Sequence, residues 1–325
     1  MHLDNRARLQ FMVGGLLYTP ANSEDLAEKL QTDAFKDLTS IAFCLEDAIH
    51  DDALEEAEQE LCHTFQTIKQ HLKPACKLPL IFVRIRTPEH MAHMHELLHP
   101  YYDILTGYIL PKFDLSNCDK YKQIITAINQ NRKTPIYIMP ILESSMIADI
   151  SSRTAILLSL KVMVDSMKDY VLNIRVGGND FCNLYGFRRN VDQSIYQIGV
   201  VRDILMDIMN VFGRDYVVSG PVWEYFGSDV TEPWAIGLQN ELALDRLNGF
   251  VGKTSIHPSQ IPLIYNSLKV SRSDYEDACR ILGWSSSTLG VEKSADGTRM
   301  NEVKCHSKWA RKIITLGEIY GIIDN

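Results

Sequence analysis

The sequence lacks an excess of positive charge. Its 33 Lys and Arg residues are outnumbered by 41 Asp and Glu residues, which leaves a formal net charge of -8. A protein whose main role is to bind nucleic acid needs a basic surface to neutralise phosphates, so that class is disfavoured. The chain also lacks any apolar run of the roughly 18 residues that a membrane span requires. We therefore expect no nucleic-acid partner and no membrane partner.

Cysteine is present but is not arranged for cross-linking or for zinc. The seven cysteines are an odd number, are spread along the chain and form no Cys-x-x-Cys pair. This distribution argues against a disulfide framework and favours free thiols in a reducing cytosol. The early apolar stretch FMVGGLLY contains two glycines and is followed by TPANSED instead of a small-residue cleavage site, so it indicates a strand and not a signal peptide. We predict a cytoplasmic protein.

Eight short apolar runs recur along the chain, with amphipathic segments between them. The runs are nearly continuous instead of alternating, which is typical of parallel strands that are covered on both faces. The segments between them, such as SEDLAEKLQTDAFKDL, carry helix-start residues. A strand followed by a helix, eight times over, predicts a TIM (β/α)8 barrel. The runs are residues 13–19, 41–46, 80–85, 107–112, 136–143, 171–178, 216–220 and 250–256.

A doubly wound sheet would also alternate strands and helices, but it needs a Gly-rich phosphate turn after the first strand. This chain has Thr-Pro-Ala-Asn at residues 19–22, so we prefer the barrel and assign it to residues 1–270. Residues 271–325 contain a helical segment, a Ser-rich stretch and a final helix from about Val303. This tail is too small for a core of its own. We expect a helical appendage that packs on the barrel or on a neighbouring subunit.

Polar residues stand at the ends of most of these runs. Taken singly, such a residue is usually a solvated loop residue or a helix cap. In a TIM barrel, however, the carboxyl ends of all strands meet at one mouth, so these side chains would share a cleft. Carboxylates crowded into one cleft repel one another unless a cation lies among them. The residues are Glu46, Asp47, Arg84, Arg86, Lys112, Glu143, Asn179, Asp180 and His257.

A divalent cation is the economical solution to this crowding. Glu143 and Asp180 follow neighbouring predicted strands, and two carboxylates suit a hard Mg²⁺ ion that keeps water and substrate in its other positions. Because side chains alternate along a strand, we do not expect both Glu46 and Asp47 to point inward. We assign Glu46 to the outer shell of the metal, where it holds a bound water. We assign Asp47 to a nearby cation or backbone group.

Six short motifs resemble, in order, those of the citrate lyase β-subunit-like family, within the superfamily that includes the HpcH/HpaI aldolases. They are AFCLEDAI, FVRIRT, YILPKFD, IMPILESS, RVGGNDF and GKTSIHPSQI, and they span nearly the whole predicted barrel. The resemblance implies a Mg²⁺-dependent carbon-carbon lyase that acts on an acyl-CoA thioester or a 2-oxo acid through an enolate. It also implies that Glu143 and Asp180 hold the metal and that Arg84 faces the substrate. A Lewis acid and a fixed guanidinium suit a developing enolate oxygen.

Two positions depart from the pattern of that family. The family usually has Asp-Leu-Glu-Asp where this chain has Cys44-Leu45-Glu46-Asp47. The family's general acid/base is an aspartate in the tail of an adjacent subunit, which implies a homotrimer or hexamer, and the matching position here is Asn301. An amide cannot take a proton at neutral pH. Either Glu302 acts as the acid/base instead, or the proton passes through water or the substrate, or the chain is not a standard acyl-CoA lyase; we name Glu302 as the candidate.

The substrate is less defined by the sequence. The tail motif MNEVKCHSKWA resembles the branch found beside tellurite-resistance stress operons, which suggests a phosphorylated or nucleoside-linked metabolite. Arg188 and Arg189 are candidates to clamp a phosphate or carboxylate, and Asp47, Lys112 and His257 are further candidates for substrate binding. Two alternatives stay open. One is a Schiff-base aldolase in which burial lowers the pKa of Lys112, and the other is a catalytically inactive metabolite-binding homologue.

Overall fold

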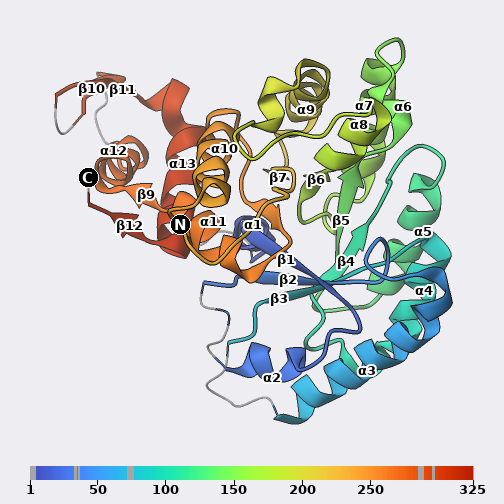
Figure 1. Ribbon diagram of the computed structural model, residues 1–325. Helices are drawn as coiled ribbons and strands as arrows, with labels where there is room; N and C mark the ends of the chain where they lie inside the picture. Colours follow the sequence, from blue (N-terminus) through green and yellow to red (C-terminus); the bar gives the residue numbers. More distant parts are fainter. Residues whose placement is uncertain are drawn as a thin grey trace.

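Eight parallel strands form a barrel in the computed structural model, which describes residues 5–32, 35, 37–71, 77–284, 289–294 and 297–324. The strands are β1 (Gly15–Pro20), β2 (Ser40–Cys44), β3 (Leu80–Arg84), β4 (Gly107–Leu110), β5 (Tyr137–Leu142), β6 (Ile174–Val176), β7 (Val218–Ser219) and β8 (Lys253–Ser255). Their order is β7-β6-β5-β4-β3-β2-β1-β8 (Figure 1). A bridge between Gly220 and Lys253 joins the two ends of this sheet. The predicted TIM barrel is therefore confirmed.

Each predicted apolar run overlaps one of these strands, because strands that are covered on both faces are apolar nearly throughout. Every residue of β2 and of β5 is buried. Alternate residues serve different layers: Ala42 and Phe82 pack inside the barrel, whereas Phe43 and Val83 pack against the outer helices. The main difference from the prediction is at the strand ends. β2 ends at Cys44, two residues earlier than expected.

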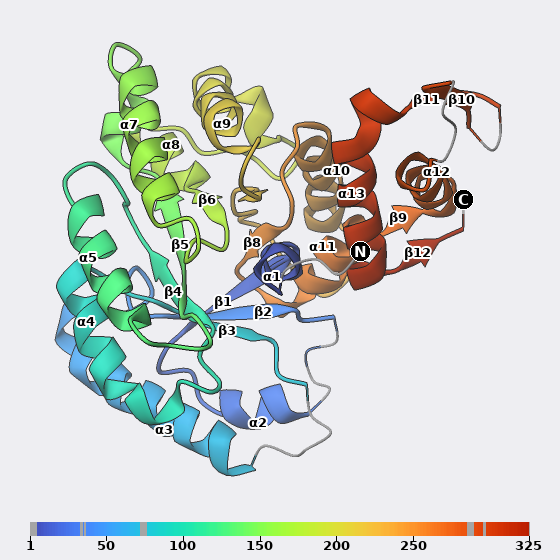
Figure 2. The ribbon, with the colours of Figure 1, turned by 180° about the vertical axis from the view of Figure 1, so that it is seen from behind.

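Helices cover the outside of the barrel (Figures 1 and 2). Residues with clear start signals begin several of them; Thr87, for example, accepts a hydrogen bond from the His90 backbone N–H, and Pro88 takes the first helical position of α4. The helices up to residue 267 are α1 (Asn5–Met12), α2 (Leu26–Gln31), α3 (Leu54–His71), α4 (Pro88–Leu97), α5 (Cys118–Asn129), α6 (Ser145–Ala148), α7 (Arg153–Ser166), α8 (Gly178–Leu184), α9 (Gly199–Phe212), α10 (Pro233–Leu247) and α11 (Ile261–Ser267).

The tail packs against helices of the barrel. Ile313 and Leu316 share an apolar cluster with Leu242 and Ile264, and the Tyr320 hydroxyl donates a hydrogen bond to the Phe11 carbonyl over 2.6 Å. The final helix begins at Val303, as the sequence predicted. Division of the chain at residue 270 stays a prediction. The tail elements are β9 (Val270–Ser271), α12 (Arg272–Leu282), β10 (Val291–Lys293), β11 (Met300–Glu302), α13 (Val303–Tyr320) and β12 (Ile322–Ile323).

The structure also bears on the state of the cysteines and on the search for membrane-spanning helices. The described cysteines are free thiols, and Cys76 lies outside the described residues. Across the part of the chain that the structure describes, no helix combines the length and apolar character needed to cross a membrane.

His95 on α4 predicts a pH dependence of stability. Its ring stacks on Tyr102 with centroids 4.3 Å apart, and burial, with Arg132 and His99, lowers the pKa of His95 from 6.5 to about 4. The unfolded chain therefore takes up this proton first as the pH falls. The contribution of His95 to stability is complete above pH 6.5 and is lost as the pH falls toward 4. In chemical denaturation between those pH values, His95→Phe should lose less stability on acidification than the wild type; equal losses would contradict this.

Candidate active site

A cavity of about 220 Å³ opens at the carboxyl ends of the strands, and we call it the mouth cavity. Residues on β1, β3, β5, β6 and β8 line it, together with residues that follow β2, β5, β6, β7 and β8. This is the end of a TIM barrel where active sites are built. The polar residues that line the mouth cavity are Tyr18, Asp47, Arg84, Glu143, Arg175, Asn179, Asp180, Glu224 and Thr254.

Glu143 and Asp180 meet at the mouth cavity. Glu143 directly follows β5, Asp180 lies in the first turn of α8 after β6, and the two strands are hydrogen-bonded neighbours. Gly177 makes their approach possible. A Cβ atom at Gly177 would lie 2.5 Å from Glu143 Oε2 and 2.8 Å from Asp180 Oδ2. The two carboxylate oxygens therefore border the same small space, which a side chain at Gly177 would fill.

These two carboxyl groups resist ionisation. Burial raises the pKa of Glu143 to about 7; Asp180 adds to the increase, whereas Arg84 opposes it. Burial also raises the pKa of Asp180, again against the effect of Arg84. A bound divalent cation would offset both negative charges and favour the ionised forms.

Arg84, the last residue of β3, is buried beside these carboxylates. Its Nη2 lies 2.8 Å from Glu46 Oε2 and 3.6 Å from Glu143 Oε1, and its Nη1 lies 3.0 Å from Asp47 Oδ2. Burial alone would lower the pKa of Arg84, but Tyr18, Glu143 and Glu46 together raise it. The guanidinium is thus held in its charged form at the wall of the mouth cavity.

The reason for expecting that Glu46 and Asp47 do not both point inward does not hold, because alternation applies only within a strand and β2 ends at Cys44. Both residues lie on the loop after β2 and contact Arg84, and of the two Asp47 lines the mouth cavity. Glu46 Oε1 also lies 2.8 Å from Lys112 Nζ, and Glu46 is not among the residues that line the mouth cavity. These contacts suit a residue that positions Arg84 better than one that holds a metal-bound water.

The amine of Lys112 does not have the lowered pKa that a Schiff-base nucleophile needs. Its side chain is 59% exposed, and its hydrogen bond to Glu46 raises the pKa of the amine, whereas such a nucleophile needs a lowered pKa. The expected lowering is therefore wrong. The backbone of Lys112 has a different use. In a left-handed conformation with φ of 48°, it donates its N–H to Glu143 Oε1 over 2.8 Å.

Arg188 and Arg189 do not form a clamp on the mouth cavity. Arg189 is buried, its Nη1 lies 2.5 Å from Glu241 Oε2, and its guanidinium lies over the Trp223 ring at 4.8 Å. Arg188 is exposed and lies 3.6 Å from Glu224. Neither arginine lines the mouth cavity. Arg189 is committed to internal contacts that a substrate would have to break.

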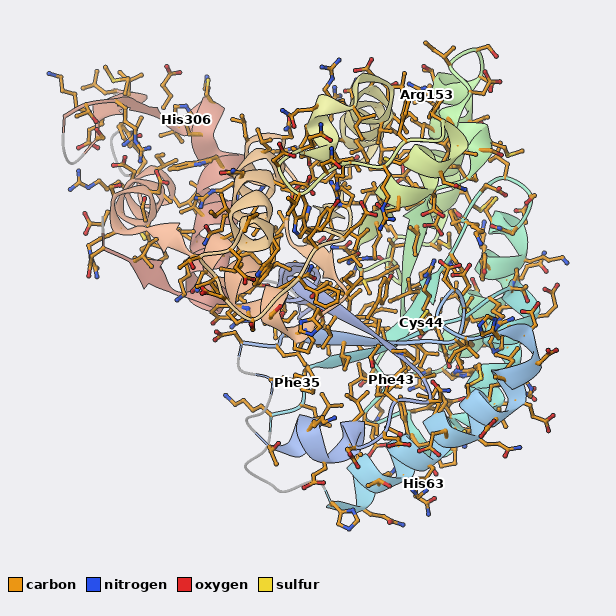
Figure 3. The ribbon with its side chains drawn as sticks, in the orientation of Figure 1. Phe35, Phe43, Cys44, His63, Arg153 and His306 are labelled. Atoms are coloured by element: carbon orange, nitrogen blue, oxygen red, sulfur yellow. The ribbon has the colours of Figure 1, made fainter. Side chains whose placement is uncertain are left out.

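His257 and Glu302 also lie outside the lining of the mouth cavity. The His257 ring stacks on Phe226, with centroids 4.4 Å apart. Glu302 ends β11, and its backbone N–H donates to His306 Nδ1 over 2.9 Å. Figure 3 shows His306 in the tail, well away from Cys44 in the barrel. The tail therefore carries Glu302 away from the cavity of its own chain.

The sequence reasoning did not identify several residues at the site. Tyr18, Arg175 and Thr254 line the mouth cavity from inside the barrel. Arg86, which the sequence did single out, acts from outside the cavity: it donates from Nε to the Leu45 carbonyl over 2.7 Å, which holds the loop that carries Glu46 and Asp47. The available signal for Arg175 was an arginine in the middle of the apolar run VLNIRVGG.

The donor set fits a hard cation with open coordination positions. Among the described residues, no three His, Cys, Asp or Glu side chains converge as ligands, so the protein would supply Glu143 and Asp180 alone. Such a site leaves room for water and for substrate oxygens, as Mg²⁺ sites usually do.

Solved structures show the same fold. The protein CitE from Mycobacterium tuberculosis, in complex with magnesium, acetoacetate and coenzyme A, superposes with a TM-score of 0.61 at 20% identity and covers 94% of this chain and 98% of its own. A citrate lyase from Burkholderia xenovorans LB400 gives 0.70 at 16% identity, covering 96% and 93%. The M. tuberculosis citrate lyase β subunit with oxaloacetate and magnesium gives 0.53 at 19%, covering 79% and 98%.

The sequence itself identifies the family. No curated protein sequence resembles the chain closely enough to count as a relative. The family described as C–C bond lyase of the TIM-barrel fold, however, matches residues 7–322, nearly the whole chain. The chain therefore belongs to the C–C bond lyase family of the TIM-barrel fold.

Proposed function

We propose that this protein is a Mg²⁺-dependent carbon-carbon lyase that cleaves or forms a bond next to the enolate of a 2-oxo acid or acyl thioester. The proposal rests mainly on one observation, the buried carboxylate of Glu143 and the half-buried carboxylate of Asp180, which Gly177 allows to meet beside Arg84. Glu143 and Asp180 would hold the metal. When bound, Mg²⁺ would act as a Lewis acid and draw electron density from the substrate oxygens.

Arg84 is the residue of this chain best placed to stabilise charge in the reaction. Its guanidinium lines the mouth cavity and is fixed by Glu46 and Asp47, so it needs little reorganisation as negative charge develops on an enolate oxygen. Burial of the guanidinium strengthens that interaction because the local dielectric constant is low. Glu46 is a positioning residue in this proposal, since it contacts Arg84 and Lys112 instead of the cavity.

The general acid/base of this proposal would come from a neighbouring copy of the chain. The side chain of Asn301 cannot take a proton, and Glu302 does not line the mouth cavity of its own chain. We therefore keep Glu302 as the acid/base only for the cavity of a neighbouring copy, in a trimer or hexamer. That assembly and the cytoplasmic location stay predictions.

Comparable proteins support the choice of substrate class. The solved M. tuberculosis structures contain magnesium with oxaloacetate, or with acetoacetate and coenzyme A. We propose the same class, a small 2-oxo acid or an acyl-CoA, for this protein. A more specific form of this proposal is that the substrate is a phosphorylated or nucleoside-linked metabolite.

Metal removal tests the proposal. After EDTA treatment and dialysis, turnover of a panel of 2-oxo acids and acyl-CoA thioesters should fall to background, and added Mg²⁺ should restore it. Activity that persists in EDTA would contradict the metal role, and trapping with borohydride would then test Lys112. Protein that binds Mg²⁺ and an oxo acid but turns over no member of the panel would instead be an inactive binding homologue.

Gly177→Ala should weaken the metal site without changing either ligand. The new methyl group would overlap the space between Glu143 and Asp180, and φ of -96° at Gly177 is acceptable for alanine, so the effect is steric. We expect Mg²⁺ affinity to fall by about 10-fold to 100-fold in isothermal titration calorimetry. Gly199→Ala is the matched control because nothing lies within 4 Å of its added Cβ. Equal Mg²⁺ affinities in the two variants would refute this site.

A further inference from the structure

Arg175 is a buried cation that the proposed chemistry does not use. It lies on β6 with 2% of its surface exposed, yet it lines the mouth cavity. Its Nη2 donates to Thr254 Oγ1 over 2.6 Å, but Nε and Nη1 make no hydrogen bond of ordinary geometry. Leaving two donors of a buried guanidinium unpaired is costly, which is why buried polar groups nearly always have partners.

No carboxylate balances the charge of Arg175. Among the described residues, the groups that act on it are Tyr18 and the guanidinium of Arg84, and burial lowers the pKa of Arg175. The other buried cations differ in this respect: Arg189 is paired with Glu241, and Arg84 with Glu46. A buried charge without a partner is unfavourable by several kcal/mol unless an anion from outside the chain joins it.

Tyr18 places a second unpaired polar group beside Arg175. Its ring lies under the Arg84 guanidinium at 5.5 Å. Its side chain also acts on Arg175, where it opposes the lowering of the Arg175 pKa by burial, but the Tyr18 hydroxyl has no hydrogen bond of ordinary geometry. The unpaired donors of Arg175 and the Tyr18 hydroxyl therefore border the same part of the mouth cavity. Their chemistry suits a bound oxyanion, which accepts several hydrogen bonds from charged and neutral donors.

Arg175 is distinct from the residues at the proposed metal site. It lies on β6, two residues before Gly177, and so about 7 Å of backbone separates it from the glycine that borders the Glu143 and Asp180 carboxylates. Arg84, in contrast, contacts Glu143 directly. The cavity thus offers two cations, Arg84 beside Glu143 and Arg175 beside Thr254, and a ligand that satisfies both carries a second anionic group.

We infer that Arg175, Tyr18 and Thr254 form a subsite for a second oxyanion group of the substrate, a carboxylate or a phosphate-type group, so that the substrate is a dianionic 2-oxo acid. This inference rests on the proposed function, because it places the reacting end of the substrate at Glu143 and Asp180. The cavity volume of about 220 Å³ requires a small acid.

Three ligands test the subsite by calorimetry in saturating Mg²⁺. 2-Oxobutyrate lacks the second anion, oxaloacetate replaces its methyl group with a carboxylate, and 3-phosphonopyruvate carries a phosphonate there. The wild-type protein should bind at least one of the two dianions about 30-fold or more tightly than 2-oxobutyrate, as expected for a buried charge pair. Tighter binding of oxaloacetate would indicate that the subsite recognises a carboxylate, and tighter binding of 3-phosphonopyruvate would indicate that it recognises a phosphate-type group.

Arg175→Gln should bring the affinities for the dianions to within about threefold of the affinity for 2-oxobutyrate. Tyr18→Phe, which keeps the ring, should reduce the preference for the dianion by about tenfold and decides the matter if the first variant does not fold. Similar affinities of the wild type for all three ligands would overturn the subsite. An equal loss of affinity for all ligands in a folded variant would overturn it too, since that indicates a structural role.

The same titrations, repeated with metal-free protein, separate this inference from the proposed function. If binding of 2-oxobutyrate does not depend on Mg²⁺, the lyase proposal fails. If it depends on Mg²⁺ but the dianions have no advantage, only the subsite fails.

Discussion

Glu143→Gln is expected to reduce turnover of the proposed lyase reaction by about 10³-fold or more, the upper range for removing one preorganised electrostatic group from an active site. The amide has nearly the shape of the carboxyl group but cannot become negative, so Asp180 alone would face the cation. Mg²⁺ affinity should fall together with kcat. Calorimetry with Mg²⁺ and steady-state kinetics on the same preparation measure both quantities.

The stability of this variant separates metal binding from folding. Burial holds the pKa of Glu143 near 7, so the ionised carboxyl is unfavourable in the metal-free fold and the neutral amide should not destabilise it. Without Mg²⁺, we expect a melting temperature at or above that of the wild type. Glu89→Gln is the control, because Glu89 is exposed and pairs only with Lys120 at the surface. Wild-type Mg²⁺ affinity in Glu143→Gln would remove Glu143 from the metal site.

Lys253→Met is expected to destabilise the fold by about 3–5 kcal/mol, the usual result of removing one partner from a buried ion pair. Lys253 is fully buried on β8, and its Nζ lies 3.0 Å from Glu241 Oε1 and 2.7 Å from Asp245 Oδ2 on α10. Without the amine, two buried carboxylates on successive turns of one helix would repel each other. The free energy of unfolding from urea denaturation measures the loss.

Lys120→Met is the matched control for this prediction. Lys120 forms an ion pair of 2.7 Å with Glu89, but both side chains are more than 60% exposed, so we expect a change below about 1 kcal/mol. Adding Glu241→Gln and Asp245→Asn to Lys253→Met should recover part of the lost stability, because the carboxylates then need no counter-charge. If Lys253→Met loses no more free energy of unfolding than Lys120→Met, the buried cluster of Lys253, Glu241 and Asp245 contributes little to stability.

The positions of the strands, and the meeting of polar side chains at their carboxyl ends, could be predicted from local sequence. Near-continuous apolar runs such as YIMPIL mark strands that are covered on both faces, and a polar residue after such a run lies at the barrel mouth. This reasoning is sufficient to bring Glu143 and Asp180 together, because each follows a strand and the two strands are neighbours. It failed for Glu46 and Asp47 because it placed the end of β2 two residues too late.

Polar residues inside the strands could not be assigned in the same way. Arg175 and Lys253 both occur within apolar runs, yet Arg175 lines the mouth cavity and Lys253 pairs with α10 outside the barrel. Which of the two faces a residue occupies depends on the register of each strand with its neighbours, and a shift of one residue would reverse it. That register is set by the pairing of strands far apart in sequence.

By itself, the sequence determined the repeating strand and helix pattern, the family, and the presence of two carboxylates at adjacent strand ends. These are properties of short segments, since hydrophobic periodicity and motif order are read along the chain. Only the tertiary structure decided that Glu46 and Asp47 both hold Arg84, that Arg189 is paired with Glu241, and that no described carboxylate is paired with Arg175. The physical reason is that the partners of a buried charge come from distant strands and helices, which only closure of the barrel brings together.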